Sequence, residues 1–266
     1  MQTILVVAGS DSFGGAGIQA DIKTGASLNV HVTTAITAIT AQNSTTVNAI
    51  YEVPAEFVVR QIETIIEDIV PMAVKIGMLY SASVITELEN IIKRHHLENI
   101  VIDPVLQAST GRPLLQPEGI DALKRLFRLA SVITPNIHEA MAITGHKIRS
   151  VDDMKQCARI LKSMGPDVII TGGHMEKECT DILYDAENYH KFSSPKIYTR
   201  HTHGTGCVFS TALAAFISKG HNILKAAELA HSFVRQAIQN SYECGHGSGP
   251  VRPGHPGHPC IIPRFS

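Results

Sequence analysis

The sequence predicts an α/β protein with a central, mostly parallel β-sheet flanked by helices on both faces. Short runs of apolar, β-branched residues alternate along the chain with longer segments in which apolar residues recur at helical spacing. The strand-like runs are apolar on both sides, which is typical of parallel strands covered from both faces. Alternation of strand and helix favours parallel neighbours joined by right-handed crossovers.

Residues 3–25 predict, in order, a strand, a glycine-rich loop and a helix. The predicted strands span residues 3–8, 30–37, 73–76, 99–103, 131–134, 167–171 and 181–184. The later predicted helices span residues 54–69, 83–96, 117–129, 150–164, 206–218 and 223–241. In the first of these helices, Ile62, Ile65 and Ile69 fall on one stripe, as a helix packed against a sheet requires.

Composition excludes several classes of protein. Hydrophobic residues make up 44% of the 266-residue chain, so it is not a disordered protein. Its 23 basic and 24 acidic residues nearly cancel, which argues against nucleic acid or an anionic membrane as partner. No apolar run reaches the roughly 18 residues of a membrane span. The five cysteines are scattered, which favours reduced thiols and a cytoplasmic location.

Domain organisation follows from the absence of a polar linker inside the chain. We expect one domain over residues 1–244 and a Gly/Pro/His-rich tail over 245–266 that forms loop or extended chain rather than a packed element. The tail region also holds metal-ligand residue types, namely Cys244, His246, His255, His258 and Cys260. Their irregular spacing argues against a metal site and favours a solvated loop near the mouth of an active site.

The first glycine cluster spans residues 8–21, after the first strand. Its segment 15–20 matches the dinucleotide fingerprint G-x-G-x-x-A, but the preceding loop is too long for the usual tight turn. The next predicted strand also lacks the terminal acidic residue of such sites, and no Lys-Ser/Thr follows as in a P-loop. Two interpretations stay open: a flexible corner between strand and helix, or close approach of backbone to a small ligand.

The second glycine cluster, residues 202–207, leads into an apolar helix of small residues. Gly204 and Gly206 let backbone N–H groups turn toward one point at the helix N-terminus, which is a suitable site for a transferring phosphoryl group. Cys207 lies in the first turn, where we expect the helix dipole to lower the thiol pKa. The alternative is an ordinary helix start with a buried cysteine.

These clusters and several further motifs together resemble the ribokinase-like superfamily, and within it the bacterial hydroxymethylpyrimidine/phosphomethylpyrimidine kinases of thiamine biosynthesis. The motifs occur in the family's order over residues 3–215. They are Ala8-Gly9-Ser10-Asp11 with residues 14–21, Thr40-Ala41-Gln42-Asn43, Lys75-Ile76-Gly77-Met78-Leu79, Ile102-Asp103-Pro104-Val105, residues 134–140, Thr171-Gly172-Gly173-His174 and His203-Gly204-Thr205-Gly206-Cys207. The resemblance implies a ribokinase-like fold.

The resemblance also implies roles at the phosphoryl-transfer site, with ATP as donor. Cys207 would act as general base, and the amides from Gly204 through Thr205 and Gly206 to Cys207 would form the anion hole. Magnesium (Mg²⁺) and its waters would be organised by Asp103, Glu139 and Asn136. For Asn136 and Glu139 a plain helix start is a compatible alternative.

Substrate contacts follow from the same resemblance, the substrate being 4-amino-5-hydroxymethyl-2-methylpyrimidine. Gln42 would pair with the aminopyrimidine edge, and Asp21 would hold polar groups of the substrate. Gly9 would allow backbone approach, while Met78 and Val105 would contact the ring. For Met78, ordinary core packing is an equal alternative.

The ATP phosphates would lie near Thr171 and Gly173, with His203 orienting the anion-hole loop or contacting the nucleotide. Many members of the family have lysine where Thr171 stands, and threonine cannot supply its charge. Related pyridoxal kinases share the Thr-Gly-Gly form and are the nearest rival, whereas Gln42 favours a pyrimidine. A non-catalytic small-ligand binder and, more distantly, a dinucleotide oxidoreductase are further alternatives. The resemblance also suggests a homodimer.

Overall fold

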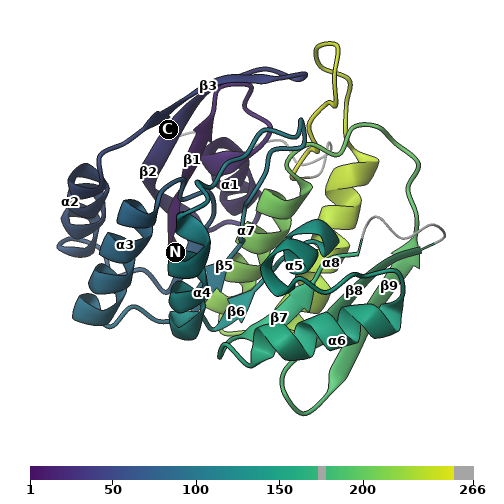
Figure 1. Ribbon diagram of the computed structural model, residues 1–266. Coiled ribbons are helices and arrows are strands. Elements are labelled where there is room, and N and C mark those ends of the chain that lie inside the picture. The colour runs from purple at the N-terminus through teal and green to yellow at the C-terminus, as the bar shows by residue number, and fades with distance from the viewer. Residues whose placement is uncertain (173–177, 255–266) are drawn as a thin grey trace, which may run out of the picture.

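A single mixed β-sheet organises the protein, whose computed structural model describes residues 1–172 and 178–254. Within these residues nine strands are hydrogen-bonded in the order β3-β2-β1-β4-β5-β6-β7-β8-β9 (Figure 1). Their bounds are β1 Thr3–Asp11, β2 His31–Gln42, β3 Val47–Glu52, β4 Ala73–Ile76, β5 Ile100–Ile102, β6 Val132–Ile133, β7 Asp167–Ile170, β8 Glu178–Tyr184 and β9 Tyr189–Pro195. The predicted α/β architecture is confirmed.

Strand direction divides the sheet into a parallel centre and antiparallel edges. Strands β2, β1, β4, β5, β6 and β7 pair in parallel in that order, whereas β3 is antiparallel to β2, β8 to β7 and β9 to β8. All four residues of β4 are buried, as expected for a strand covered on both faces. The apolar run over residues 181–184 predicts a further parallel strand. This prediction is wrong, because β8 is antiparallel to β7. The link between β7 and β8 is shorter than the dozen or so residues of a parallel crossover.

Helices cover both faces of the sheet. Their bounds are α1 Gly17–Ser27, α2 Ala55–Ile66, α3 Ala82–His95, α4 Gly119–Leu126, α5 Ile137–Thr144, α6 Val151–Lys162, α7 Thr205–Ser218 and α8 Ile223–Gln239. Helices α2 to α6 contribute to one apolar core with the sheet. Helices α1, α7 and α8 form a second core on the opposite face (Figure 1). Among the described residues, no helix is long and apolar enough to cross a membrane.

Three elements of the fold are not predicted by the sequence patterns. The edge strands β3 and β9 alternate between exposed and half-buried residues, so neither has the continuous apolar run of a central strand. Helix α5 is only eight residues long, and its start after Pro135 was visible only as a cap signal.

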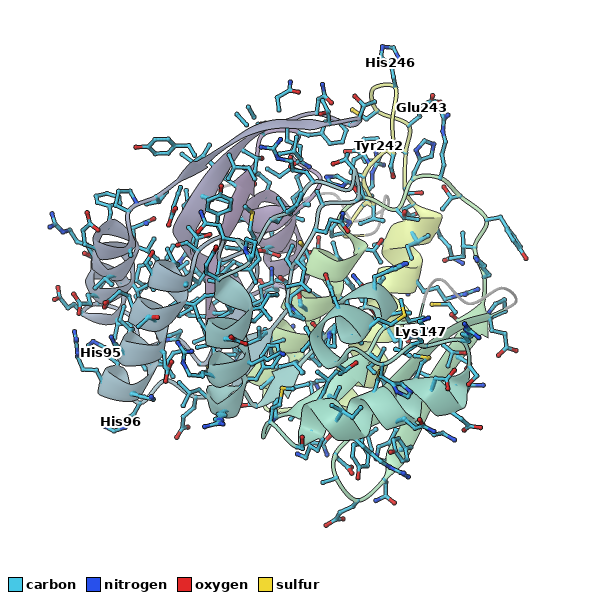
Figure 2. The ribbon with its side chains drawn as sticks, in the orientation of Figure 1. His95, His96, Lys147, Tyr242, Glu243 and His246 are labelled. Carbon is cyan, nitrogen blue, oxygen red and sulfur yellow. The ribbon has the colours of Figure 1, made fainter. Side chains whose placement is uncertain are left out.

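The chain after α8 differs from the expected unpacked tail. Residues 245–254 contain no helix, but Val251 is buried and its N–H donates to the carbonyl of His203 at 3.1 Å. Hydrogen bonds on both sides of His203 therefore hold this segment beside the N-terminus of α7. Figure 2 shows His246 at the tip of the loop between α8 and the buried Val251. The other candidate metal ligands of the tail, at positions 255, 258 and 260, lie outside the described residues.

Candidate active site

The loops at the carboxyl ends of the parallel strands carry most of the motif residues. Asp11 ends β1, Asp103 follows β5, Asn136 follows β6 and Thr171 follows β7. Carboxyl ends of parallel strands share one edge of a sheet, where open α/β proteins bind their ligands. The N-terminus of α7 reaches the same edge, since Gly206 lies close to the Asp103 carboxylate.

Asp11 fixes the shape of the first glycine loop. Its Oδ1 accepts the Phe13 N–H at 2.9 Å, and its Oδ2 accepts those of Gly15 and Ala16 at 3.0 and 2.9 Å. Burial alone would raise the pKa of Asp11, but the hydrogen bond and charge of His203 and these N–H groups lower it. The loop between β1 and α1 is therefore a fixed structure rather than a flexible corner.

His203 joins the two glycine clusters. Its Nε2 lies 2.9 Å from Oδ2 of Asp11, and its Nδ1 lies 3.4 Å from Oγ of Ser109. A side chain at Gly15 would clash with the His203 ring. Because both ring nitrogens face protein groups, the structure gives His203 a positioning contact and does not present it to a nucleotide.

Helix α7 begins at Thr205, and its N-cap residue Gly204 has φ of 84°. A side chain at this position would clash with the Gly15 carbonyl, so both the conformation and the close approach require glycine. The first N–H groups of a helix lack intrahelical partners and carry the positive end of its dipole. The predicted anion hole is therefore compatible with the geometry of the loop.

Cys207 lies half-buried in the first turn of α7. Burial and the charges of Asp21 and Asp103 raise the pKa of its thiol to about 12, although Lys75 and the Gly17 N–H oppose this. The expectation that the dipole gives Cys207 a low pKa is therefore wrong. Removal from water is the largest cause of this raised pKa, and the two nearby carboxylates add to it.

Beneath Cys207 lies a fully buried ion pair. Nζ of Lys75 lies 3.1 and 3.0 Å from the two carboxylate oxygens of Asp21, and Thr211 Oγ1 donates to Oδ1 of Asp21 at 2.6 Å. Burial alone would lower the pKa of Lys75, but the charges of Asp21, Cys207 and Asp103 raise it. Asp21 is 0% exposed. The structure therefore does not support the expected contact between Asp21 and substrate.

Asp103 and Glu139 form a pair of buried carboxyls near α7. Burial raises the pKa of Asp103 to about 6, against the opposing effects of Lys75 and the Ser210 hydroxyl. Burial and the charge of Asp103 raise the pKa of Glu139 to about 8, against the opposing backbone hydrogen bonds. A raised pKa means that burial disfavours the ionised form of each carboxyl. A cation nearby would stabilise that ionised form.

Asn136 and Glu139 also cap α5. The Glu139 N–H donates to Oδ1 of Asn136 at 3.0 Å, and the Asn136 N–H donates to Oε2 of Glu139 at 2.9 Å. These two reciprocal hydrogen bonds form a capping box, so the helix-start interpretation is confirmed. Oε1 of Glu139 takes no part in this capping box. In the described part of the chain no group of three or more His, Cys, Asp or Glu could hold a metal. Two carboxylates still fit Mg²⁺, which keeps waters and substrate phosphates as its other ligands.

The residues predicted to contact substrate fall into two groups. Gly9 packs on Met78, since a Cβ at Gly9 would lie 2.7 Å from the Met78 sulfur, and Met78 and Val105 share an apolar cluster. Gln42 lies at the end of β2, where its backbone exchanges 2.8 Å hydrogen bonds with the Ser12 hydroxyl. Thr171 pairs with Asn136 through an isolated bridge. Gly173 lies outside the described residues.

Four polar residues of this site were not predicted individually: Asp11, Lys75, Ser210 and Thr211. Lys75 had a usable signal, because it is the one charged residue in the apolar strand β4. Ser210 and Thr211 lie one turn after Cys207, so helical spacing alone places them on the same side as the thiol. Asp11 carried no such signal, because its partner His203 is 192 positions away.

This fold and site define a small-molecule phosphotransferase of the α/β class. The model of the phosphomethylpyrimidine kinase family matches residues 11–252. A hydroxymethylpyrimidine/phosphomethylpyrimidine kinase of Bacillus subtilis is 45% identical over 251 residues, 93% of each chain. The chain therefore belongs to the phosphomethylpyrimidine kinase family, as its motifs predicted.

Solved structures agree with this assignment and add a second relationship. A phosphomethylpyrimidine kinase from Clostridium difficile is 39% identical with a TM-score of 0.80, covering 90% of this chain and 100% of that one. The ADP complex of a Bacillus subtilis pyridoxal kinase is 38% identical with a TM-score of 0.89, covering 95% and 97%. These neighbours confirm the ribokinase-like fold.

Proposed function

We propose that this protein transfers the γ-phosphoryl group of ATP to the hydroxymethyl oxygen of 4-amino-5-hydroxymethyl-2-methylpyrimidine, and then a second one to the resulting monophosphate. The observation that carries the proposal is the convergence of the α7 N-terminus with Lys75 and the Asp103–Glu139 pair at the carboxyl edge of the sheet. Phosphoryl transfer depends mainly on positioning and on stabilising negative charge, which this arrangement offers.

The backbone N–H groups of Gly204, Thr205, Gly206 and Cys207 would stabilise charge on the transferring group. The fixed contact of Gly204 with Gly15 supports this role, because preorganised donors need no rearrangement during the reaction. Lys75 adds a buried positive charge whose field reaches the Cys207 thiol.

Cys207 would accept the proton of the acceptor hydroxyl. With a pKa of about 12 the thiol is protonated in the ligand-free protein, so the base role needs a change in its surroundings. Asp103 is one of the carboxylates that raise this pKa, and neutralising its charge lowers the pKa. A cation held at Asp103 would therefore favour the thiolate form of Cys207. Cys207→Ala should reduce turnover by about 10²–10⁴-fold.

Asp103 and Glu139 would hold Mg²⁺ and its waters, with Asn136 orienting Glu139 through the α5 cap. A bound Mg²⁺ would neutralise charge on the ATP phosphates. Thr171, beside Asn136, would contact the phosphates by a hydrogen bond, with Gly173 two positions later in the sequence. His203 would act by holding the loop at Asp11.

The pyrimidine ring would lie against Gly9, Met78 and Val105, with its amino edge toward Gln42. The packing of Met78 against Gly9 and the shared cluster with Val105 support one continuous apolar surface. The Gln42 amide offers both a donor and an acceptor to an aminopyrimidine.

Pyridoxal is the second candidate acceptor. The pyridoxal kinase of Bacillus subtilis has nearly the same fold, and Thr171 stands where many pyrimidine kinases have lysine. Gln42 favours the pyrimidine. Gln42→Met should therefore abolish pyrimidine turnover while leaving the fold intact, as checked by circular dichroism.

The deciding experiment measures ADP release with Mg-ATP and hydroxymethylpyrimidine, its monophosphate or pyridoxal. Turnover of both pyrimidines supports the proposal. Turnover of pyridoxal alone would keep the kinase and replace the substrate, and tight binding with no ADP from any acceptor would favour a non-catalytic binder.

We further propose a homodimer that works in the cytoplasm, with a pyrimidine rather than a macromolecule as its partner. The family resemblance supports the dimer, and light scattering of the purified chain would test it. The described cysteines are free thiols, which is typical of a reducing compartment.

A further inference from the structure

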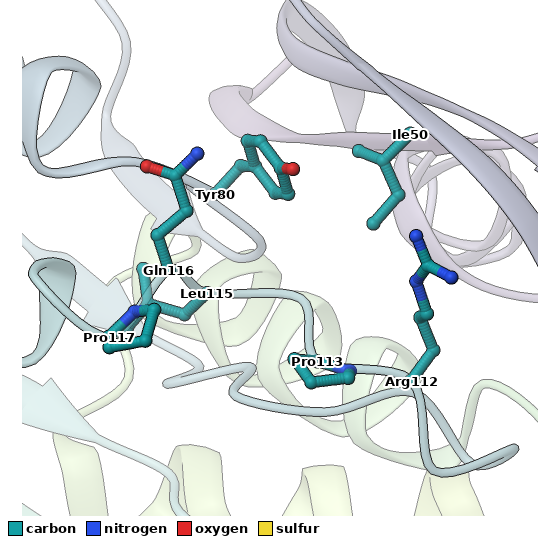
Figure 3. A pocket seen from close by; sticks show the side chains of 7 residues that line it. All are labelled: Ile50, Tyr80, Arg112, Pro113, Leu115, Gln116 and Pro117. Atoms are coloured by element: carbon teal, nitrogen blue, oxygen red, sulfur yellow. The ribbon is translucent and has the colours of Figure 1, made fainter.

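A cavity of about 370 Å³ lies between β3 and the loop that follows β5. Figure 3 shows its lining side chains, which are Ile50, Tyr80, Arg112, Pro113, Leu115, Gln116 and Pro117. The volume falls in the range of roughly 300–1,000 Å³ that small-molecule sites occupy. None of the phosphoryl-transfer residues described above lines it.

A continuous row of contacts connects the cavity to the N-terminus of α7. The Gly17 N–H bonds to the Cys207 thiol, and Gly17 packs on the Gly9 carbonyl. Gly9 in turn packs on Met78. The apolar cluster that contains Met78 also packs against two walls of the cavity, Ile50 and Tyr80. The cavity therefore lies at the far end of the predicted ring surface from the anion hole.

Several cavity groups are available to a ligand. Among the described residues, neither the Arg112 guanidinium nor the Gln116 side-chain amide has a hydrogen-bond or ion-pair partner. In Figure 3 the Arg112 side chain extends toward Ile50, and Tyr80 and Gln116 lie across from it. Tyr80 has φ of 68°, a conformation that bulky residues rarely adopt and that clusters at functional sites.

Two successive phosphorylations at one anion hole impose a geometric demand. In the first, the hydroxymethyl oxygen attacks the γ-phosphorus and gives its proton to Cys207, while the bond from this phosphorus to the ADP oxygen breaks and ADP leaves. In the second, an oxygen of the new monophosphate attacks, the bond to the ADP oxygen breaks, and ADP leaves. The attacking oxygen must reach the same position in both steps. The ring must therefore lie farther from α7 in the second step by the length of one phosphoryl group.

We propose that the cavity lined by Ile50, Tyr80 and Arg112 receives the displaced pyrimidine ring during the second phosphorylation. This inference rests on the proposed function. The Arg112 guanidinium can stack on a planar ring, and Gln116 can pair with an aminopyrimidine edge. The first step does not use the cavity, because its ring lies nearer to α7 on Met78 and Val105.

Ile50→Trp, which fills the cavity, tests the proposal, with Tyr51→Trp as the matched control. Tyr51 neighbours Ile50 on the same strand but is 67% exposed and does not line the cavity. ADP release is measured separately with the hydroxymethyl compound and with its monophosphate. We expect Ile50→Trp to lower kcat/KM for the monophosphate by about tenfold or more and that for the hydroxymethyl compound by less than about twofold. Tyr51→Trp should change neither.

Arg112→Ala provides an independent test, because Arg112 is exposed and its loss leaves no buried group unpaired. We expect a loss of about three- to tenfold confined to the monophosphate. Equal losses in both steps, or no loss in either, with either variant would overturn the cavity assignment. Failure of the unaltered protein to phosphorylate the hydroxymethyl compound would instead refute the proposed function.

Discussion

The Nε2 atom of His203 lies 2.9 Å from Oδ2 of Asp11, across 192 positions of sequence. The same carboxylate oxygen accepts two N–H groups of the loop between β1 and α1. The pair therefore couples the loop after the first strand to the start of α7. Neither glycine cluster is held by its local sequence alone, because Asp11 and His203 come from different clusters.

Asp11→Asn should destabilise the protein more at neutral pH than in acid. The pKa of Asp11 is lowered in the folded state below its ordinary value of 3.8. A lowered carboxyl pKa contributes stability above the unfolded-state value, and this stability is lost as the pH falls through the folded-state pKa. We expect a loss of about 1–3 kcal/mol at pH 7 that shrinks toward pH 3, measured by urea unfolding.

Asp152 offers a control for this variant. It is 81% exposed at its side chain and pairs with Lys155 on α6. Asp152→Asn should change the free energy of unfolding by less than about 0.5 kcal/mol at either pH. An Asp11→Asn effect that is equally large at pH 3 would show that the ionised carboxylate is not what holds the loop.

Cys207 should resist alkylation in the ligand-free protein. Its thiol pKa of about 12 leaves almost no thiolate at pH 8, and the thiolate is the reactive form. Cys244 is an exposed free thiol and serves as the internal reference. Mass spectrometry after timed iodoacetamide treatment should show Cys244 modified first by a wide margin. Faster modification of Cys207 would contradict the raised pKa.

Most of the fold could be predicted because its central elements have strong local patterns. The helix over Ile223–Gln239 and the strand over Ala73–Ile76 were each predicted to within two residues. Edge strands were lost because only one of their faces contacts the core. In β3, exposed residues such as Asn48 and Ala49 give no apolar run to recognise.

Features of the candidate site that depend on a local sequence motif could be predicted. Features that depend on residues brought together by the fold could not. The positions of Gly204 and Glu139 follow from a turn and a cap, which are local features. The pKa of Cys207 depends on Asp21 and Asp103, which belong to other elements and meet the thiol only in the folded chain. The sequence identifies Cys207, Asp21 and Asp103 as site residues. It does not show how far burial in the folded chain raises the pKa of the Cys207 thiol.

Glu139→Gln should make stability less dependent on pH. The folded-state pKa of Glu139 is raised from 4.5 to about 8, so the folded protein keeps a proton that the unfolded chain releases. Stability therefore falls as the pH rises through this window. Glutamine keeps an acceptor for the α5 cap but cannot ionise. Relative to the unaltered protein, the variant should gain on the order of 4 kcal/mol between pH 5 and pH 8.5.

Urea unfolding at the two pH values, without nucleotide or Mg²⁺, measures this effect. Glu187→Gln, at an exposed position in the turn between β8 and β9, should leave the difference unchanged. Identical pH profiles for Glu139→Gln and the unaltered protein would mean that Glu139 is already ionised at pH 5.

Lys75→Met should cost about 3–5 kcal/mol of stability, because it leaves the buried Asp21 carboxylate without its cation. Lys75→Met combined with Asp21→Asn should recover much of this loss, since asparagine is neutral and can still accept the Thr211 hydroxyl. Lys225→Met breaks an exposed pair with Glu228 and should cost less than about 1 kcal/mol. Urea unfolding of the three variants at pH 7 measures these differences. A double variant no more stable than Lys75→Met alone would show that the lysine contributes by packing. A stable but inactive double variant would show instead that the charge of Lys75 is needed at the α7 terminus.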